Sequence, residues 1–176
     1  MAHISSLGAG IFTYLDIFKG TIPAGTDTAA ECAALFVGST PGTVDADHLR
    51  MPSVREFPSV GTPANIVNVP VYGQKTSSQV QGQSDAPSLE VTVNYNAGDM
   101  TAIHDLVGEA CVFRFMMCSS AVTEDEGAAA TVTPENTEFY FKGKIEAILV
   151  NPALTDATTA TVTLSAQSDF FGPATL

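Results

Sequence analysis

The sequence contains no tryptophan and is poor in cations, with 7 Lys and Arg residues against 19 Asp and Glu residues in 176. The net charge is therefore −12. Sequence-independent binding to a nucleic-acid backbone depends on Lys and Arg replacing counterions, so this composition disfavours it. If the protein meets DNA, we expect it to let the DNA pass rather than to hold it.

Cysteine is also scarce. Cys32, Cys111 and Cys118 are widely spaced, odd in number and match neither a CxxC nor a CxxH pattern. This arrangement argues against a disulfide scaffold and against a zinc site. We expect three buried thiols in a protein made in a reducing cytosol.

Long apolar runs are missing. No stretch approaches the roughly 18 continuous apolar residues of a membrane span. The start, MAHISSLGAGIF, lacks the basic segment and long apolar run of a secretory signal. We expect a soluble protein without a membrane partner.

Patterns that carry catalysis are absent as well. None of His3, His48 and His104 lies in an HxH, HExxH or GxSxG setting. The acidic run at 124–126 lacks the alternating ligand spacing of a calcium loop. We therefore expect no enzyme activity, no catalytic residue, no cofactor and no metal.

What the sequence does contain is period-2 alternation, which is typical of strands with one buried face. Residues 87–95 alternate in this way, and residues 138–147 and 159–165 do so again. Residues 8–19 and 111–118 are apolar on both sides, so we expect both faces of those strands to be covered. A further short strand is expected at 33–37, and prolines at positions 52, 58, 63 and 70 place short strands at a sheet edge.

One helix is convincing. Asp99 is placed to cap a helix that runs to about Glu109, with one apolar stripe packed on the sheet: Met100, Ile103, Leu106, Val107 and Ala110. The length fits one domain. The predicted class is mostly β, an antiparallel β-sandwich or barrel flanked by one short α-helix, with long loops.

Two segments are not explained by packing within one small core. Residues 73–86 form a polar, Gln- and Ser-rich loop, which we expect to be mobile in an isolated subunit and ordered by a partner. The C-terminal pair Phe170 and Phe171 is expected to be exposed and to reach a neighbour. Copies of the same chain commonly cover such a surplus of edge and face.

The order of several segments resembles the core of the major tail tube proteins of long-tailed, non-contractile (siphovirus) bacteriophages. These segments are SLEVTVNYNAGD, then LVGEA at the end of the helix, then VFRFMM, FYFKGKIEAI and TATVTLSAQSDF. Upstream, VREFP at 54–58 and VQGQ at 80–83 are similar to the family's lead-in to the central strand. The resemblance covers about residues 53–171.

The resemblance implies a single tail-tube domain over residues 1–176. Its parts are an N-terminal strand and long loop extension (1–52), the tube core (53–171) and a tail (172–176). Residues 20–50 look longer than in better-known members, and no additional C-terminal immunoglobulin-like domain is expected.

The family's biology supplies further expectations. They are homo-hexameric rings that stack into a tube, a lumen through which DNA passes without specific binding, and a place in the virion after synthesis in the host cytoplasm. Tail terminator, baseplate or tip, and tape-measure proteins are the implied partners.

Three sets of site residues follow as hypotheses. A ring-stacking loop uses Gln74, Lys75, Gln79, Gln81 and Gln83. Acids on polar strand faces line the lumen and keep phosphates from its wall: Glu90, Glu138 and Glu146. Terminal subunit contacts come from Phe170 and Phe171.

Two other classes stay open from the residues. A ring-forming tube protein like that of bacterial type VI secretion would share the hexamers but pass effectors instead of DNA. A carbohydrate-binding β-sandwich would need an exposed aromatic platform, for which no Trp and only 4 Tyr are available.

Overall fold

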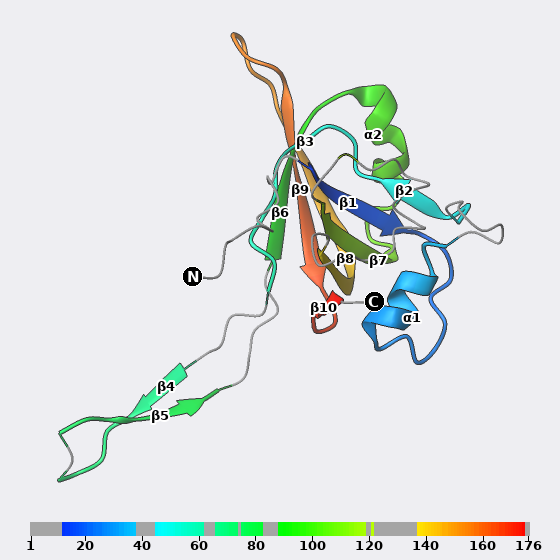
Figure 1. The fold of residues 1–176 in the computed structure, drawn as a ribbon. Helices are drawn as coiled ribbons and strands as arrows, with labels where there is room; N and C mark the ends of the chain where they lie inside the picture. The colour runs from blue at the N-terminus through cyan, green and yellow to red at the C-terminus, as the bar shows by residue number, and fades with distance from the viewer. Residues whose placement is uncertain are drawn as a thin grey trace, which may run out of the picture.

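The computed structural model describes residues 12–37, 45–61, 66–73, 75–82, 88–118, 121 and 137–174. Within them the chain forms one curled antiparallel sheet of eight strands, a projecting two-stranded hairpin and two short helices (Figure 1). The sheet contains β1 (Thr13–Phe18), β2 (His48–Arg50), β3 (Val54–Glu56), β6 (Ser88–Asn94), β7 (Ala110–Met117), β8 (Thr137–Asn151), β9 (Thr159–Ala166) and β10 (Phe171–Ala174). The predicted mostly β class is confirmed.

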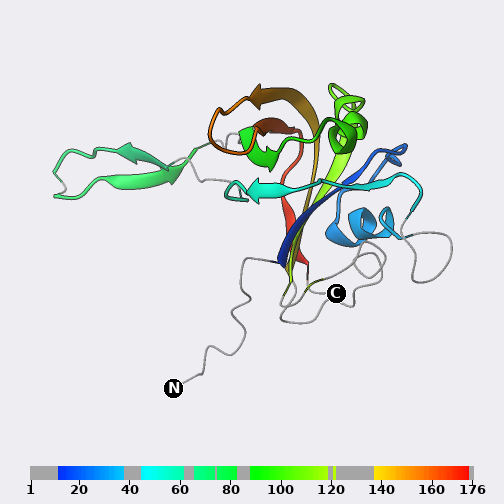
Figure 2. The same cartoon turned by 90° about the horizontal axis from the view of Figure 1, so that it is seen from above.

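The strand order is β2-β1-β7-β8-β9-β6-β3, with β10 paired to β8. The two edge strands, β2 and β3, are consecutive in the chain. Between them, the Met51 amide donates to the Leu15 carbonyl in β1 at 2.8 Å, and the Asn94 amide of β6 donates to the Ser53 carbonyl at 2.9 Å. So short a segment reaches both edges because the sheet curls back on itself, as Figure 2 shows.

The interior of the curled sheet holds the main core. Its buried members come from β1, β6, β7, β8 and β9, and from α2 (Ala97–His104), and include Leu15, Ile17, Leu89, Val91, Val93, Met100, Ile103, Phe113, Phe141, Val162 and Leu164. The alternations in β6 and β9 therefore predict the inward residues correctly.

The predicted helix exists, but its bounds differ. Asn96, not Asp99, is the N-cap, and its side-chain oxygen accepts from the Gly98 amide at 3.1 Å. The helix ends at His104, five residues before the expected end at Glu109 because Gly108, at φ 84°, redirects the chain toward β8, where its amide donates to the Ile145 carbonyl at 2.8 Å. Val107 is 40% exposed, so the apolar stripe ends with Leu106.

The strand expected at 33–37 is wrong. Residues Ala29–Ala34 form α1, and Thr28 caps it in a capping box with Glu31. The Glu31 carboxylate accepts from the Thr28 amide at 3.0 Å, while Thr28 Oγ1 accepts from the Glu31 amide at 3.3 Å. This reciprocal pairing satisfies amides that a short helix otherwise leaves free, and the Thr-x-x-Glu spacing was its sequence signal.

The segment expected to be a polar loop is partly a strand. β4 (Ile66–Val69) pairs with β5 (Ser78–Gln81) in a two-stranded sheet separate from the rest. We call residues 66–82 the arm. It extends well away from the curled sheet in both views (Figures 1 and 2).

Candidate assembly interface

The arm exposes several large apolar side chains. Val67 faces Val80 across the β4–β5 pair, and these side chains are 49% and 54% exposed. Ile66, Val69 and Val71 are also exposed, and Tyr72 at the turn is fully exposed. An isolated two-stranded hairpin is marginally stable in water, and exposed apolar patches of this kind mark protein interaction sites.

Three of the five hypothesised stacking residues lie in the described part of this arm. Gln79 is in β5 opposite Asn68, and Lys75 follows the turn; both are exposed. Gln81 ends β5, while Gln74 and Gln83 lie outside the described residues. Sequence reasoning chose the glutamines and missed the valines and Tyr72, although the β-branched run before Tyr72-Gly73 was an available signal for the first strand.

A second feature is the polar outer face of β6 and β9. Glu90 is exposed and pairs across the sheet with Thr163, and the following outward pairs are Thr92 with Thr161 and Asn94 with Thr159. Glu146 lies at a bulge in β8, and its carboxylate accepts from the Ser165 hydroxyl. Two of the three hypothesised lumen acids thus share one Thr- and Ser-rich face, on which Lys144 is the register partner of Ser165.

The third acid, Glu138, does not lie on a solvated face. Its side chain is 2% exposed, and it accepts a short hydrogen bond from the Tyr140 hydroxyl. The alternation in β8 does separate two faces. However, β10 pairs with this end of the strand, with Ala174 opposite Glu138, and α1 packs against β8. Burial raises the pKa of Tyr140, and the neighbouring Glu138 carboxylate raises it further.

Under α1, the outer face of the sheet holds a buried row of charges. Asp16 in β1 is the register partner of Arg50 in β2 and of Arg114 in β7. Asp16 accepts from Arg50 Nε at 2.8 Å and from Arg114 Nη2 at 2.5 Å, and His48 Nε2 lies 3.4 Å from Asp16 Oδ2. Arg114 also stacks on the Phe36 ring, with Cζ 4.6 Å from the centroid.

The electrostatics of this row favour the ionised carboxylate. Burial by itself raises the pKa of Asp16, but the hydrogen bonds from His48 and Arg50 and the charge of Arg114 outweigh it and hold that pKa well below its ordinary value. A buried carboxylate between two guanidiniums stays charged, so the row fastens β1, β2 and β7 together.

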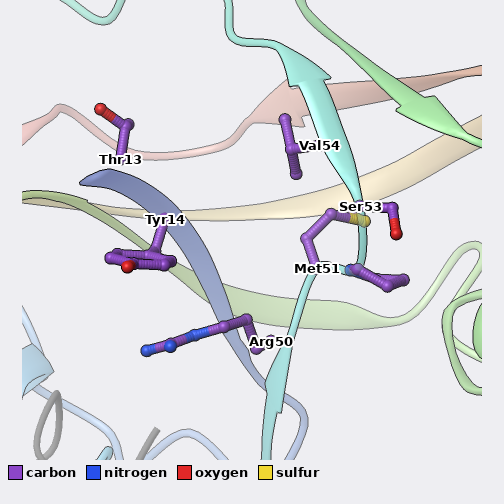
Figure 3. A pocket seen from close by; sticks show the side chains of 7 residues that line it. Thr13, Tyr14, Arg50, Met51, Ser53 and Val54 are labelled. Atoms are coloured by element: carbon purple, nitrogen blue, oxygen red, sulfur yellow. The ribbon is translucent and has the colours of Figure 1, made fainter. Parts of the chain in front are cut away.

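A pocket of about 380 Å³ lies beside this row, between the start of β1 and the β2–β3 corner. In Figure 3 the side chains of Tyr14 and Arg50 extend together on one side, with Met51 and Ser53 on the other. The Arg50 guanidinium lies over the Tyr14 ring at 4.4 Å and donates to Asp16. Its charge is therefore engaged within the fold.

The C-terminal aromatic residues are not exposed as expected. Phe170 packs on Phe141 of the core with ring centroids 5.1 Å apart, and Phe171 begins β10 opposite Tyr140. Both side chains are half-buried. Phe170 and Phe171 therefore pack within their own subunit, and a contact of either residue with a neighbouring subunit stays a prediction.

The described residues offer little reactive chemistry. No group of three His, Cys, Asp or Glu side chains in the described ranges is placed to hold a metal. The thiols of Cys32 and Cys111 are buried, and burial raises the pKa of each to about 11. Both helices of the described ranges are too short to cross a bilayer.

The fold of this chain is that of a phage tail tube protein. The structure is similar to the tail tube protein of bacteriophage SPP1, solved by solid-state NMR and cryo-EM. The TM-score is 0.53 at 13% sequence identity, and the match covers 94% of this chain and 80% of the SPP1 chain. No protein family model and no curated protein sequence matches the chain.

Proposed function

We propose that this protein is a structural subunit of a bacteriophage tail tube, which self-assembles into hexameric rings that stack around a channel for the genome. The arm is the observation that carries the proposal. It presents Val67, Val80 and Tyr72 to solvent on a chain whose fold is that of a tail tube protein. A surface that repeats head to tail generates rings or filaments.

In this assembly the arm contributes to the contact between successive rings. Its strands pack extensively only with each other among the described elements, so no described element of its own subunit covers the exposed valines. Contact with the next ring buries them, and Gln79 and Lys75 add polar contacts at the rim, as interfaces generally combine an apolar centre with a polar edge.

The channel wall is the polar face of β6 and β9 in this proposal. Glu90 and Glu146 lie on it among hydroxyl side chains. Carboxylates on the wall repel phosphates and leave the DNA free to move. The protein has no enzymatic role here; its partners are further copies of itself and the tail terminator, tip and tape-measure proteins, and its place is the virion.

The test is assembly of the purified protein. Sedimentation velocity over a concentration series, with negative-stain electron microscopy of the same samples, is expected to show rings and tubes that grow with concentration. A protein that remains an 18.3 kDa species at every concentration and salt would refute the proposal. Far-UV circular dichroism on each sample excludes unfolding as the cause.

A further inference from the structure

A groove of about 670 Å³ lies between the β1–α1 connection and the α2–β7 turn. Its residues are of three kinds: apolar Ile22, Leu106 and Ala110; acidic Asp105 and Glu109; and Lys19, Gly20 and Thr21. Both acids are exposed. Three of the eight lining residues are therefore apolar, and two acids against one lysine give the groove a net negative charge.

The tip of the arm has the complementary character. Tyr72 is fully exposed, and Lys75 is the only charged residue between Ile66 and Gly82. The arm is thus cationic in a chain of net charge −12. An aromatic ring next to an ammonium group suits a surface that offers apolar side chains flanked by carboxylates.

Arm and groove lie on opposite sides of the same subunit. In both views the arm leaves the curled sheet on one side, while α2 and the α1 end of β1 lie on the other (Figures 1 and 2). A subunit does not reach its own groove with its own arm in this arrangement. A contact between the two is therefore a contact between copies, of the head-to-tail kind that repeats.

We propose that the groove receives the arm tip of a neighbouring copy, with Tyr72 on Leu106 and Ala110 and with Lys75 beside Asp105 and Glu109. The inference rests on the proposed function and adds the receiving surface for the arm. It also gives α2 and its following turn a role beyond closing the core, since that turn carries both acids of the groove.

Charge reversal tests the pairing. Lys75→Glu places a carboxylate between two others and is expected to raise the concentration needed for assembly roughly tenfold. Adding Glu109→Lys in the same chain restores a pair of opposite charges and is expected to recover most of the loss. The matched control is K75E with Glu56→Lys, which has the same net charge but changes an exposed residue of β3 outside the groove.

Cross-linking tests the contact directly, because all three native cysteines are buried. A mixture of Tyr72→Cys and Ala110→Cys proteins is expected to form a disulfide-linked dimer on mild oxidation under assembly conditions. The control mixture pairs Y72C with Thr155→Cys, an exposed site between β8 and β9, and is expected to remain unlinked.

The outcomes separate the two proposals. Wild-type tubes together with Y72C–A110C linkage and E109K rescue support both. Wild-type tubes with neither linkage nor rescue overturn the groove assignment and leave the proposed function standing. Failure of the wild-type protein to form any ring or tube overturns the proposed function, and the groove assignment falls with it.

Discussion

Asp16 and Arg114 face each other across β1 and β7, and Arg114 Nη2 donates to Asp16 Oδ2 at 2.5 Å with both side chains 2% exposed or less. The pair lies on the outer face of the sheet, where Phe36 at the end of α1 covers the guanidinium. Since Asp16 also accepts from Arg50, one carboxylate joins three adjacent strands.

Removing this carboxylate is expected to destabilise the fold strongly. Asp16→Ala leaves the Arg114 charge buried without its partner, and breaking a buried pair in this way costs about 3–5 kcal/mol. Urea denaturation followed by circular dichroism measures the loss. Asp156→Ala is the control, because its pair with Arg55 spans 3.7 Å between exposed side chains and is expected to change stability by less than about 1 kcal/mol. Equal losses in the two variants would contradict the structural role of Asp16.

The same carboxylate predicts the direction of an acid effect. Its pKa is lowered in the folded protein from the ordinary 3.8, so the folded state binds its proton less readily than the unfolded state does. The stabilisation is therefore complete above about pH 4 and is lost as the pH falls toward the folded pKa. Urea midpoints measured at pH 5, 4 and 3 are expected to fall more steeply for the wild-type protein than for Asp16→Asn. Parallel curves would show that Asp16 does not contribute to acid unfolding.

The cysteines are expected to be unreactive in the native protein. All three are buried, and burial raises the pKa of Cys32 and of Cys111 to about 11, so little thiolate forms at pH 8. A colorimetric thiol reagent at pH 8 is expected to find no reactive thiol before denaturation and all 3 after it. Rapid reaction of a thiol in the folded protein would contradict this placement.

The sequence predicted the strands with a clear alternation well, because one face of β6 and of β9 is apolar and the other polar throughout. Prediction from the sequence was wrong where an element distant in the chain covers one face of a strand. Glu138 looks solvated from its neighbours alone, but its side chain is buried, and α1, which is distant in the chain, packs against β8.

The misread helix and hairpin have local causes. In α1 the apolar run at 33–37 outweighed the Thr28–Glu31 capping signal, although the run begins inside the helix and ends with exposed Val37. In the arm, the polar composition of residues 73–86 concealed β5, whose one valine pairs with Val67. With a single valine, β5 has no hydrophobic alternation to reveal it.

The apolar arm predicts a separation between folding and assembly. Val67→Ser with Val80→Ser removes one cross-strand apolar pair that is exposed in the subunit. We expect an unchanged urea midpoint, because the main core does not include these residues, together with rings that no longer stack into tubes. Thr92→Ser with Thr161→Ser, a cross-strand pair on the β6–β9 face, is the control. Normal tubes from the valine variant would count against the arm as the stacking element.

The acids of the β6–β9 face predict an effect on DNA passage without one on assembly. Glu90→Lys with Glu146→Lys replaces two negative charges with two positive charges per subunit on the face that we propose lines the channel. Repeated around a ring, these charges attract phosphates and are expected to slow genome ejection, and high salt is expected to relieve this effect.

Fluorescence of released DNA measures ejection from phage particles carrying the variant, and electron microscopy confirms that their tails have normal length. Glu56→Lys with Asp156→Lys has the same net charge and changes two exposed acids outside that face, the arm and the groove, so it separates a local effect from a general one. Ejection at the wild-type rate by the Glu90 and Glu146 variant would mean that this face does not line the channel.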